Sequence, residues 1–450
     1  MAAPTTASRT DEPATIALLS PCGWGNLGDA AIVDSLIHGI RERTPNVRIV
    51  AFTLNPQDTS ERHSVEAYTC AAFSLPLYPV REPSEREGPG ANGAGSVPKK
   101  GLAGRIKAAA RSALRRWPIH GAARTWALVP FRVMSEPSHY ARSRKRLEGA
   151  STLIVAGGGQ LDGAWGGTLG HPYVLWRWGR LARSVGARFV FASVGTGSLT
   201  SLSRRLVQRA LALASYRSYR DERSRELLRS PRLVANDAIV PDLAYALPVE
   251  AAASPRGDHL VIGLSPMNYR LPNRWPRPDA ARYRAHIAGF AELGARAIAD
   301  GHEVVMFATD DDAPAIDDVV AAIRRLSPGG APKLRIAATP TVDALLATLA
   351  EIDVVVAARL HGVILSHVAL RPVLAVAHER KVKTVMEEMG HQHFCLDIDF
   401  DPRIGYARLL ELARQHGALT EQIAARVAAN RRRVVAQYDA LFGPAVPGAG

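Results

Sequence analysis

Short runs of apolar and β-branched residues alternate with longer amphipathic stretches along most of the chain. The first run covers residues 15–20, a helical pattern follows from about Asp29 to Arg43, and the next run covers residues 47–53. Strands separated by helical stretches of this length predict βαβ units on a parallel sheet. The pattern continues with strands over residues 152–156 and 188–193 and near Tyr216 and Leu233, and with helices over residues 169–185 and 202–214.

The same alternation restarts after residues 248–257, a stretch of Pro, Ala, Ser and Gly that we interpret as a linker. We therefore expect an α/β protein with two doubly wound, Rossmann-like domains, residues 14–248 and 258–400, that face a cleft. Ligands of such folds bind outside the carboxyl ends of the strands. The remaining parts are a disordered start over residues 1–13 and C-terminal helices and a tail over residues 401–450. Strands of the second domain are expected over residues 260–264, 303–307, 334–336, 354–357 and 373–376.

One segment, a basic insertion over about residues 81–135, breaks this alternation. It begins rich in Pro, Gly, Ser and Glu, and from Gly88 to Ser135 it contains no acidic residue. Apolar residues three to four apart predict a basic amphipathic helix over residues 99–124, which suits an anionic membrane surface. A solvated helix packed on the domain is the alternative, and nucleic acid is not expected because no stacking aromatics are interleaved. The basic residues are Lys99, Lys100, Arg105, Lys107, Arg111, Arg115, Arg116, Arg124 and Arg132.

Composition excludes several classes of protein. The 450 residues carry a net charge of +14, which favours an anionic partner. No apolar run approaches the roughly 18–20 residues that a membrane-spanning helix needs, and the start has no apolar core of a signal peptide. Three cysteines, Cys22, Cys70 and Cys395, fit neither a disulfide framework nor a zinc site. We expect a cytoplasmic protein without a bound metal.

Two glycine-rich segments follow predicted strands of the first domain. The first contains Asn26, Gly28 and Asp29, and its backbone N–H groups could approach an anion at the following helix. Turn glycines with Asp29 as the helix N-cap are the simpler interpretation, which composition alone favours. The second segment, residues 157–159, is expected to be a loop whose backbone, at Gly158 and Gly159, approaches a ligand.

Further polar residues follow predicted strands. Asp162 comes just after the second glycine segment, placed to hydrogen-bond a hydroxyl, and Trp165 could stack on a sugar face. Arg220 could point toward the cleft, while its neighbour Asp221 is expected to cap a surface helix. The acidic run over residues 310–312 is interpreted as a capped loop, since its spacing fits no calcium site.

The most informative cluster begins after the predicted strand over residues 353–357. Arg359 and His361 lie two residues apart at its carboxyl end, and Lys381 and Lys383 follow the next strand. Arginine offers a planar fork for a carboxylate or phosphate, lysine a point charge, and histidine a proton near neutral pH. This combination favours a cleft that binds an anionic substrate.

These segments together resemble the polysaccharide pyruvyl transferase family. The segment Gly-Asn-Leu-Gly-Asp at residues 25–29 is similar to the start of the family pattern, and Arg-Leu-His-Gly at residues 359–362 to a later block. The glycines at 157–159, the segment 219–224 and the segment 373–381 match in the same order. The sequence departs at His378, where the family usually has an aromatic residue, and in the long basic insertion. Neither departure is expected to touch the Arg-Leu-His block.

The resemblance implies a fold like that of B-type glycosyltransferases and transfer of pyruvate from phosphoenolpyruvate onto two hydroxyls of a sugar as a cyclic ketal. No cofactor is implied beyond this donor substrate. On this basis His361 is the general acid, Arg359 and Arg220 clamp the donor, and Asp162 orients or deprotonates the acceptor hydroxyl. The cleft-lining residues are then Asn26, Gly28, Asp29, Gly158, Gly159, Trp165 and Lys381.

Two other functions remain open at this stage. A sugar-nucleotide-dependent glycosyltransferase of the same fold needs a similar cleft and similar charges, and donor choice distinguishes it. A non-catalytic scaffold on a membrane surface is the second of these alternatives. Docking and catalysis are compatible, because a lipid-linked glycan would bring the acceptor to the inner face of the membrane. The sequence names neither the sugar nor its carrier.

Overall fold

A computed structural model of the chain describes residues 14–446 apart from 24, 72–128, 164–165, 232, 234–236, 249–258 and 269–278. The predicted basic helix over residues 99–124, most of the predicted linker and Trp165 lie outside the described residues. The chain divides into two compact units. Residues 1–71 and 146–450 form the first unit, which contains both sheets, and residues 72–145 form the second, which contains most of helix α5 (Val129–Leu147).

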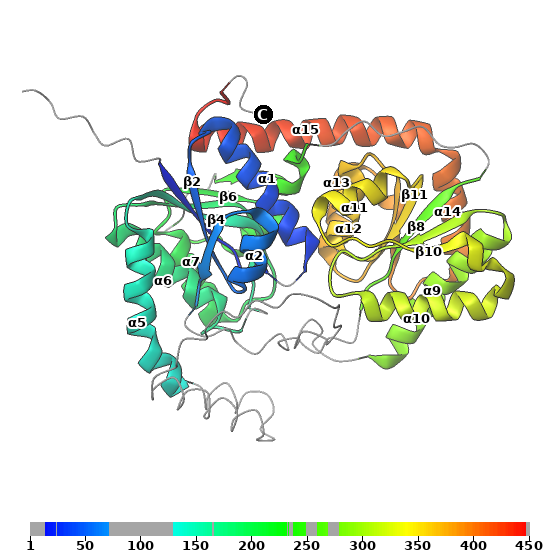
Figure 1. Cartoon of the computed structure of the whole chain (residues 1–450), viewed down its shortest axis with the longest axis horizontal. Helices are drawn as coiled ribbons and strands as arrows, with labels where there is room; N and C mark the ends of the chain where they lie inside the picture. Colours follow the sequence, from blue (N-terminus) through cyan, green and yellow to red (C-terminus); the bar gives the residue numbers. More distant parts are fainter. Residues whose placement is uncertain are drawn as a thin grey trace, which may run out of the picture. The chain divides into compact units, whose positions relative to one another are not determined.

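A seven-stranded parallel sheet forms the first half of the large unit, in the order β3-β2-β1-β4-β5-β6-β7 (Figure 1). Its central strands are buried along almost their whole length, which is why they appear in the sequence as continuous apolar runs. The strands are β1 (Thr15–Leu19), β2 (Arg48–Thr53), β3 (Glu66–Thr69), β4 (Ala150–Leu161), β5 (Arg188–Thr196), β6 (Tyr216–Tyr219) and β7 (Ala238–Ile239).

The helices of this half cover both faces of the sheet. From β1 the chain moves to β2 in one direction, and from β4 through β5 to β6 in the other. Because crossovers between parallel strands are right-handed, α1 covers one face while α6 and α7 cover the opposite face. The helices are α1 (Leu27–Arg43), α2 (Pro56–His63), α6 (His171–Ser184), α7 (Ser201–Leu211), α8 (Glu222–Leu227) and the short 3₁₀ helix η1 (Leu243–Ala246).

Strand β4 corrects the prediction of a glycine loop. Gly157 and Gly158 have φ angles of +44° and +69°, yet the backbone continues to pair with β5 as far as Leu161, with a register shift after Gly158. A Cβ on Gly157 would lie 2.8 Å from Ile32 of α1. The glycines therefore form a bulge inside a strand, where close packing of α1 and positive φ angles both require them.

A six-stranded parallel sheet forms the second half, in the order β10-β9-β8-β11-β12-β13. Its strands are β8 (Val261–Ser265), β9 (Glu303–Met306), β10 (Leu334–Ile336), β11 (Val354–Ala357), β12 (Val373–Ala377) and β13 (Cys395–Asp397). Its helices are α9 (Ala280–Ala299), α10 (Ala313–Leu326), η2 (Pro328–Lys333), α11 (Val342–Ala350), α12 (Leu360–Val368), α13 (Arg380–Met389) and η3 (Gln392–Phe394). Both halves thus have the expected Rossmann-like α/β fold.

The C-terminal helices α14 (Pro402–Arg414) and α15 (His416–Phe442) connect the two halves. Helix α15 begins beside α14 and contacts α12, then runs on to α1 and η1 of the first half (Figure 1). Near its end, the Tyr438 hydroxyl lies 3.0 Å from the Ser35 hydroxyl, and the buried guanidinium of Arg43 lies 2.6 Å from Asp439. The last helix therefore ties the two halves together.

The strand predicted near Leu233 falls mostly on residues outside the described part of the chain, and the seventh strand is found at Ala238–Ile239. One local prediction is wrong. Asp29 is not the N-cap of α1. Asn26 is, and its side chain accepts hydrogen bonds from the backbone N–H groups of Gly28 and Asp29.

Within the residues that the structure describes, no helix is long and apolar enough to cross a membrane.

Candidate active site

The N-terminus of α1 lies against the second half of the molecule. The Leu27 N–H donates to the carbonyl of Thr309 at 2.9 Å, and Asn26 caps the next two N–H groups at 2.9 and 3.1 Å. A Cβ on Gly28 would lie 1.8 Å from Nδ1 of His361. Only glycine leaves room for the imidazole, so the early glycine segment and the Arg-Leu-His block meet here.

His361 lies in the first turn of α12 with its side chain mostly buried. Its Nδ1 edge lies over Gly28, and its Nε2 atom is 3.6 Å from Oδ2 of Asp242. Nε2 is buried and has no hydrogen-bond partner among the described residues. The imidazole is thus held between a helix N-terminus and a buried carboxylate.

Asp242 supplies the central negative charge. It follows β7, is 2% exposed, and accepts the Ala244 N–H with Oδ1, while Oδ2 lies 3.3 Å from Nη1 of Arg220. Burial by itself would raise the pKa of this carboxyl, but His361 and Arg220 outweigh it and lower the pKa to about 2. The sequence pattern did not point to Asp242 as the partner of His361.

Arg220 reaches Asp242 from the carboxyl end of β6. A Cβ on Gly195 would lie 2.7 Å from Nη2 of Arg220, so the absence of a side chain on β5 makes room for the guanidinium. Asp221 caps α8 by accepting the Ser224 N–H at 2.7 Å, as predicted from the sequence. Three site residues from three different strand ends, Arg220, Asp242 and His361, therefore form one cluster.

Arg359 is held by the acidic run that the sequence analysis interpreted as a capped loop. Its Nε and Nη2 donate to the two carboxylate oxygens of Asp312 at 2.7 and 2.6 Å, and Nη1 lies 3.2 Å from Asp310. Asp312 occupies the N-cap position of α10, but its side chain caps no N–H group of that helix. It turns instead to Arg359 and to the Asn268 N–H, because a buried guanidinium needs a matched carboxylate.

Polar atoms without partners surround the first turn of α12. The side-chain oxygens of Ser265 and Thr309 are buried and have no hydrogen-bond partner among the described residues. A Cβ on Gly362 would lie 3.9 Å from the Ser265 oxygen and 3.8 Å from Thr309 Cγ2. A helix N-terminus with two such hydroxyls suits an anion.

Asp162 lies in a second group, at the end of β4. A Cβ on Gly197 would lie 1.8 Å from Oδ2 of Asp162, and the next residue, Gly163, donates its N–H to the Ser198 carbonyl. Asp29 of α1 points toward β4, 3.6 Å from where a Cβ on Gly158 would stand. The space beside Gly159 is open.

Among the residues that the structure describes, Lys381 makes no direct contact with either group. It is 44% exposed and pairs with Glu379 at 2.6 Å. Burial opposes ionisation of Glu379, but His378 and Lys381 hold its pKa well below the usual value. His378 lies close to the Arg-Leu-His block, with its Nδ1 3.2 Å from the carbonyl of Ala358, the residue before Arg359.

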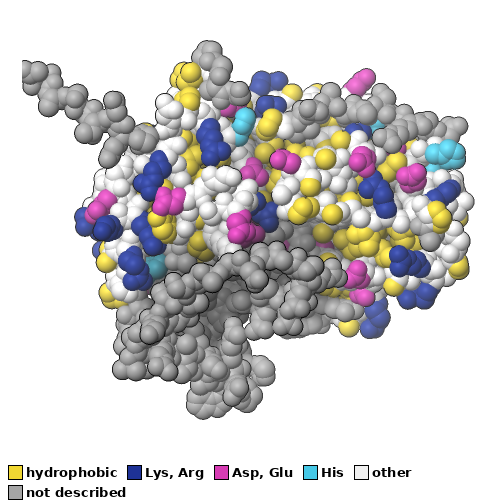
Figure 2. Space-filling view, in the orientation of Figure 1, with side chains coloured by type: hydrophobic (Ala, Val, Ile, Leu, Met, Phe, Trp, Pro, Cys, Tyr) yellow, Lys and Arg dark blue, Asp and Glu magenta, His cyan; other side chains and the backbone are white. Residues whose placement is uncertain are grey.

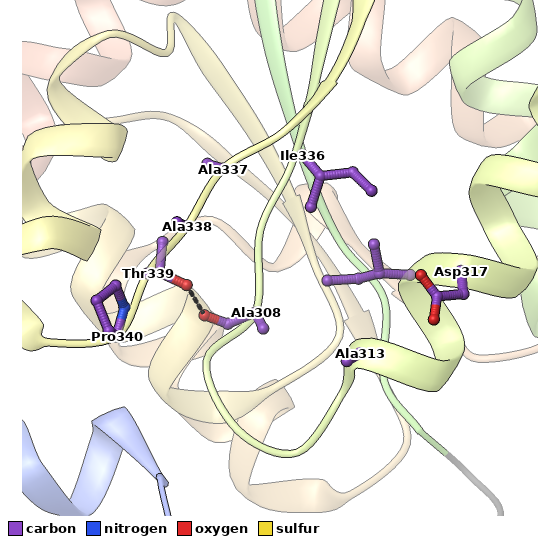
Figure 3. Close-up of a pocket in the computed structure, with 9 residues that line it drawn as sticks. Ala308, Ala313, Asp317, Ile336, Ala337, Ala338, Thr339 and Pro340 are labelled. Carbon is purple, nitrogen blue, oxygen red and sulfur yellow. Dashed lines mark hydrogen bonds between the residues drawn. The ribbon is translucent and has the colours of Figure 1, made fainter. Parts of the chain in front are cut away.

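An open pocket of about 370 Å³ lies at the carboxyl ends of β9 and β10 and the start of α10 (Figure 3). Its walls are mainly small and apolar, and the Thr339 hydroxyl donates to the Ala308 carbonyl across it. Its volume falls within the range of about 300–1,000 Å³ typical of small-molecule sites. The nine lining residues are Ala308, Ala313, Ile316, Asp317, Ile336, Ala337, Ala338, Thr339 and Pro340.

Among the described residues, no group of three or more His, Cys, Asp or Glu side chains is placed to hold a metal ion.

The chain matches a family model described as polysaccharide pyruvyl transferase over residues 26–380. No curated protein matches it significantly. Among solved structures, HepE from Anabaena in complex with UDP shares 10% sequence identity, with a TM-score of 0.51 over 95% of this chain and 98% of that one. S. aureus MnaA in its UDP co-structure also shares 10%, with a TM-score of 0.53 over 96% and 97%. The fold is of the B type known from glycosyltransferases.

Proposed function

Because the chain belongs to the polysaccharide pyruvyl transferase family, we propose that it transfers pyruvate from phosphoenolpyruvate onto two hydroxyls of a sugar, forming a cyclic ketal. The observation that carries this proposal is the cluster of His361, Asp242 and Arg220 beside the first turn of α12. It combines a proton donor, its counter-charge and a cation next to a helix N-terminus that suits an anion. The acceptor is a sugar of a polysaccharide or of its precursor.

His361 acts as the general acid. Nε2 faces Asp242, which supplies the counter-charge for the imidazolium that delivers the proton. The proton goes to the methylene carbon of phosphoenolpyruvate, and the adjacent carbon becomes an oxocarbenium-like centre. A sugar hydroxyl attacks that carbon and loses its proton. Phosphate then leaves with the C–O bonding pair, and a second hydroxyl attacks and loses its proton to close the ketal.

The donor's two anionic groups are bound by arginines and by the start of α12. Arg220 keeps one edge on Asp242, and Arg359 is fixed by Asp310 and Asp312, so both guanidinium groups are preorganised. The Ser265 and Thr309 hydroxyls would hydrogen-bond an anion at the first turn of α12. Asp162 orients or deprotonates the acceptor hydroxyl, Gly159 and the Asn26–Asp29 segment line the acceptor side of the cleft, and Lys381 adds positive charge at its edge.

Phosphate release from phosphoenolpyruvate tests this function. The purified chain is incubated with the donor and a panel of galactosides, mannosides and N-acetylhexosamines. Acceptor-dependent release, abolished in Arg359→Ala and His361→Ala and kept in the matched control His393→Ala, is the expected result. His393 suits the control because it is about half exposed in η3 and pairs with Glu411 at 2.9 Å. Wild-type turnover by His361→Ala would remove the general-acid assignment.

A glycosyltransferase that uses a sugar nucleotide is the second candidate function. Two solved structures of similar fold contain UDP, and the pocket in Figure 3 lies at the strand ends where a nucleoside could bind. Protection against thermal unfolding distinguishes the two donors. Stabilisation by phosphoenolpyruvate and not by UDP-sugars supports pyruvyl transfer, and the reverse result supports the glycosyltransferase.

A further inference from the structure

The helices α6 and α7 carry an unusual charge distribution. On the face drawn in Figure 2, Lys and Arg side chains are interspersed with Asp and Glu. Residues 163–220 contain no acidic residue at all. They contain the nine arginines Arg177, Arg180, Arg183, Arg188, Arg204, Arg205, Arg209, Arg217 and Arg220. Unlike the basic insertion, this stretch lies largely within the part of the chain that the structure describes.

The arginines that face solvent come from two helices packed side by side on one face of the first sheet. All five are exposed, and none has a carboxylate partner among the described residues. On α7, the arginines at 204, 205 and 209 are spaced one and four residues apart, which keeps them on one side of the helix. On α6, the guanidinium of Arg180 lies over the ring of Trp176, 5.1 Å from its centroid. The five are Arg180, Arg183, Arg204, Arg205 and Arg209.

Two large apolar side chains protrude beside these arginines. Leu202, in the first turn of α7, is 58% exposed, and Leu169, just before α6, is 43% exposed. The hydroxyl of Thr168 lies 2.9 Å from that of Ser203, which joins the two segments that carry the leucines. Both segments follow strands β4 and β5 at their carboxyl ends, the same edge as Asp162.

We propose that Leu169, Leu202 and these five arginines, here called the α6–α7 surface, dock the protein on an anionic lipid bilayer. Unpaired arginines attract acidic headgroups, and exposed leucines gain by entering the acyl boundary. A nucleic acid would use the charge but not the leucines, and the surface offers no row of stacking aromatics. This docking would present a lipid-linked glycan beside Asp162. That last step rests on the proposed function, whereas the docking itself does not.

Vesicle co-sedimentation of the full chain tests the docking. The wild type is expected to bind vesicles of phosphatidylglycerol and phosphatidylcholine, to ignore phosphatidylcholine alone, and to be released by salt. The variant Arg204→Glu/Arg205→Glu/Arg209→Glu should bind the anionic vesicles on the order of 100-fold more weakly, because each lost basic residue weakens such binding several-fold. The variant Leu169→Ser/Leu202→Ser should bind more weakly even at low salt.

The matched control lies on α10 of the second half. Arg324 and Arg325 are exposed at its C-terminus and Leu326 is 56% exposed, so Arg324→Glu/Arg325→Glu/Leu326→Ser changes similar groups elsewhere. The control should bind as the wild type does. Equal loss in the control and in the α7 variant, or wild-type binding by the α7 variant, overturns the proposal. Phosphate release with a water-soluble acceptor should persist in the α7 variant, so failure of docking and failure of pyruvyl transfer are separate results.

Discussion

Buried carboxylates decide how the basic residues of the site are arranged. Asp312 has no exposed surface, binds Arg359 through both oxygens, and also accepts the Asn268 N–H at 2.8 Å. Asp242 is almost as buried and lies between His361 and Arg220. Each carboxylate compensates a cation that would otherwise be buried alone, so removing one affects more than a single contact.

Asp312→Ala should lower the free energy of unfolding by about 3 kcal/mol, because it removes the two hydrogen bonds that this carboxylate accepts from Arg359 and the one that it accepts from the Asn268 N–H. Urea denaturation measures the loss. The control Asp317→Ala, at an exposed position on the same helix, should change stability by less than about 0.5 kcal/mol. Equal effects of the two substitutions would mean that the Arg359–Asp312 pair does not contribute as described.

Asp242→Asn removes the charge beside His361 and keeps the shape of the side chain. If His361 must be protonated, the alkaline limb of the pH–rate profile should move to lower pH, because the charges of Asp242 and the imidazolium stabilise each other. The control Asp237→Asn breaks a pair with Arg217 at the other end of β7 and should leave the profile in place. An unshifted profile for Asp242→Asn would contradict its role as the positioning residue of His361.

At the scale of elements, glycines set how closely helices approach. A Cβ on Gly39 of α1 would lie 2.3 Å from Cδ2 of Tyr438 on α15, so this glycine allows the contact that joins the two halves. Ser218 donates to Gln437 of the same helix, and Arg433 donates to the Ile239 carbonyl at 2.6 Å. The position of α15 therefore depends on a close approach and on polar contacts around it.

Gly39→Ala should destabilise the protein by about 1–3 kcal/mol, although the same change inside a helix usually stabilises it. Gly417→Ala, in α15 and with open space around the added methyl group, is the matched control and should be neutral or stabilising. Thermal unfolding compares the two. In a Tyr438→Ala background the Gly39→Ala penalty should shrink, and a penalty of unchanged size would show that Tyr438 is not its cause.

At the scale of the whole molecule, buried histidines couple the fold to pH. His171, His286 and His367 are all fully or almost fully buried. Burial lowers the pKa of His171 to about 4, and it lowers those of His286 and His367 to about 3. In the unfolded chain the same groups titrate near pH 6.5.

The contribution of these histidines to the free energy of unfolding should therefore be fully present above about pH 6.5 and be lost as the pH drops toward 3. In that range the unfolded chain binds protons that the folded chain excludes, and each histidine costs up to about 1.4 kcal/mol per pH unit. Asp242 adds a further loss between its unfolded pKa near 3.8 and its folded pKa of about 2. Urea midpoints between pH 7.5 and 4 measure the slope.

Replacing His367, which has no hydrogen bond among the described residues, tests the origin of that slope. His367→Leu should flatten the dependence on pH, whereas His38→Gln at a partly exposed position of α1 should leave it as in the wild type. A slope that is the same in all three proteins would place the acid sensitivity elsewhere.

Much of the fold was predictable from the sequence, because buried parallel strands appear as apolar runs and amphipathic helices as a period of three to four residues. The strands around β1, β5, β9, β11 and β12 follow from such runs. Short edge strands such as β7 did not, since two residues carry no period. The cap of α8 by Asp221 was predictable because capping acts within three residues.

By itself, the sequence determined the Rossmann-like class, the order of the polar segments at the strand ends and the family. Tertiary structure alone decided that Asp242 faces His361, that Asp312 holds Arg359, that Gly28 makes room for an imidazole and that residues 157–159 stay within a strand. The physical reason is distance along the chain. Periodicity and capping are local, whereas the partner of a buried charge is chosen by packing between segments that are far apart in sequence.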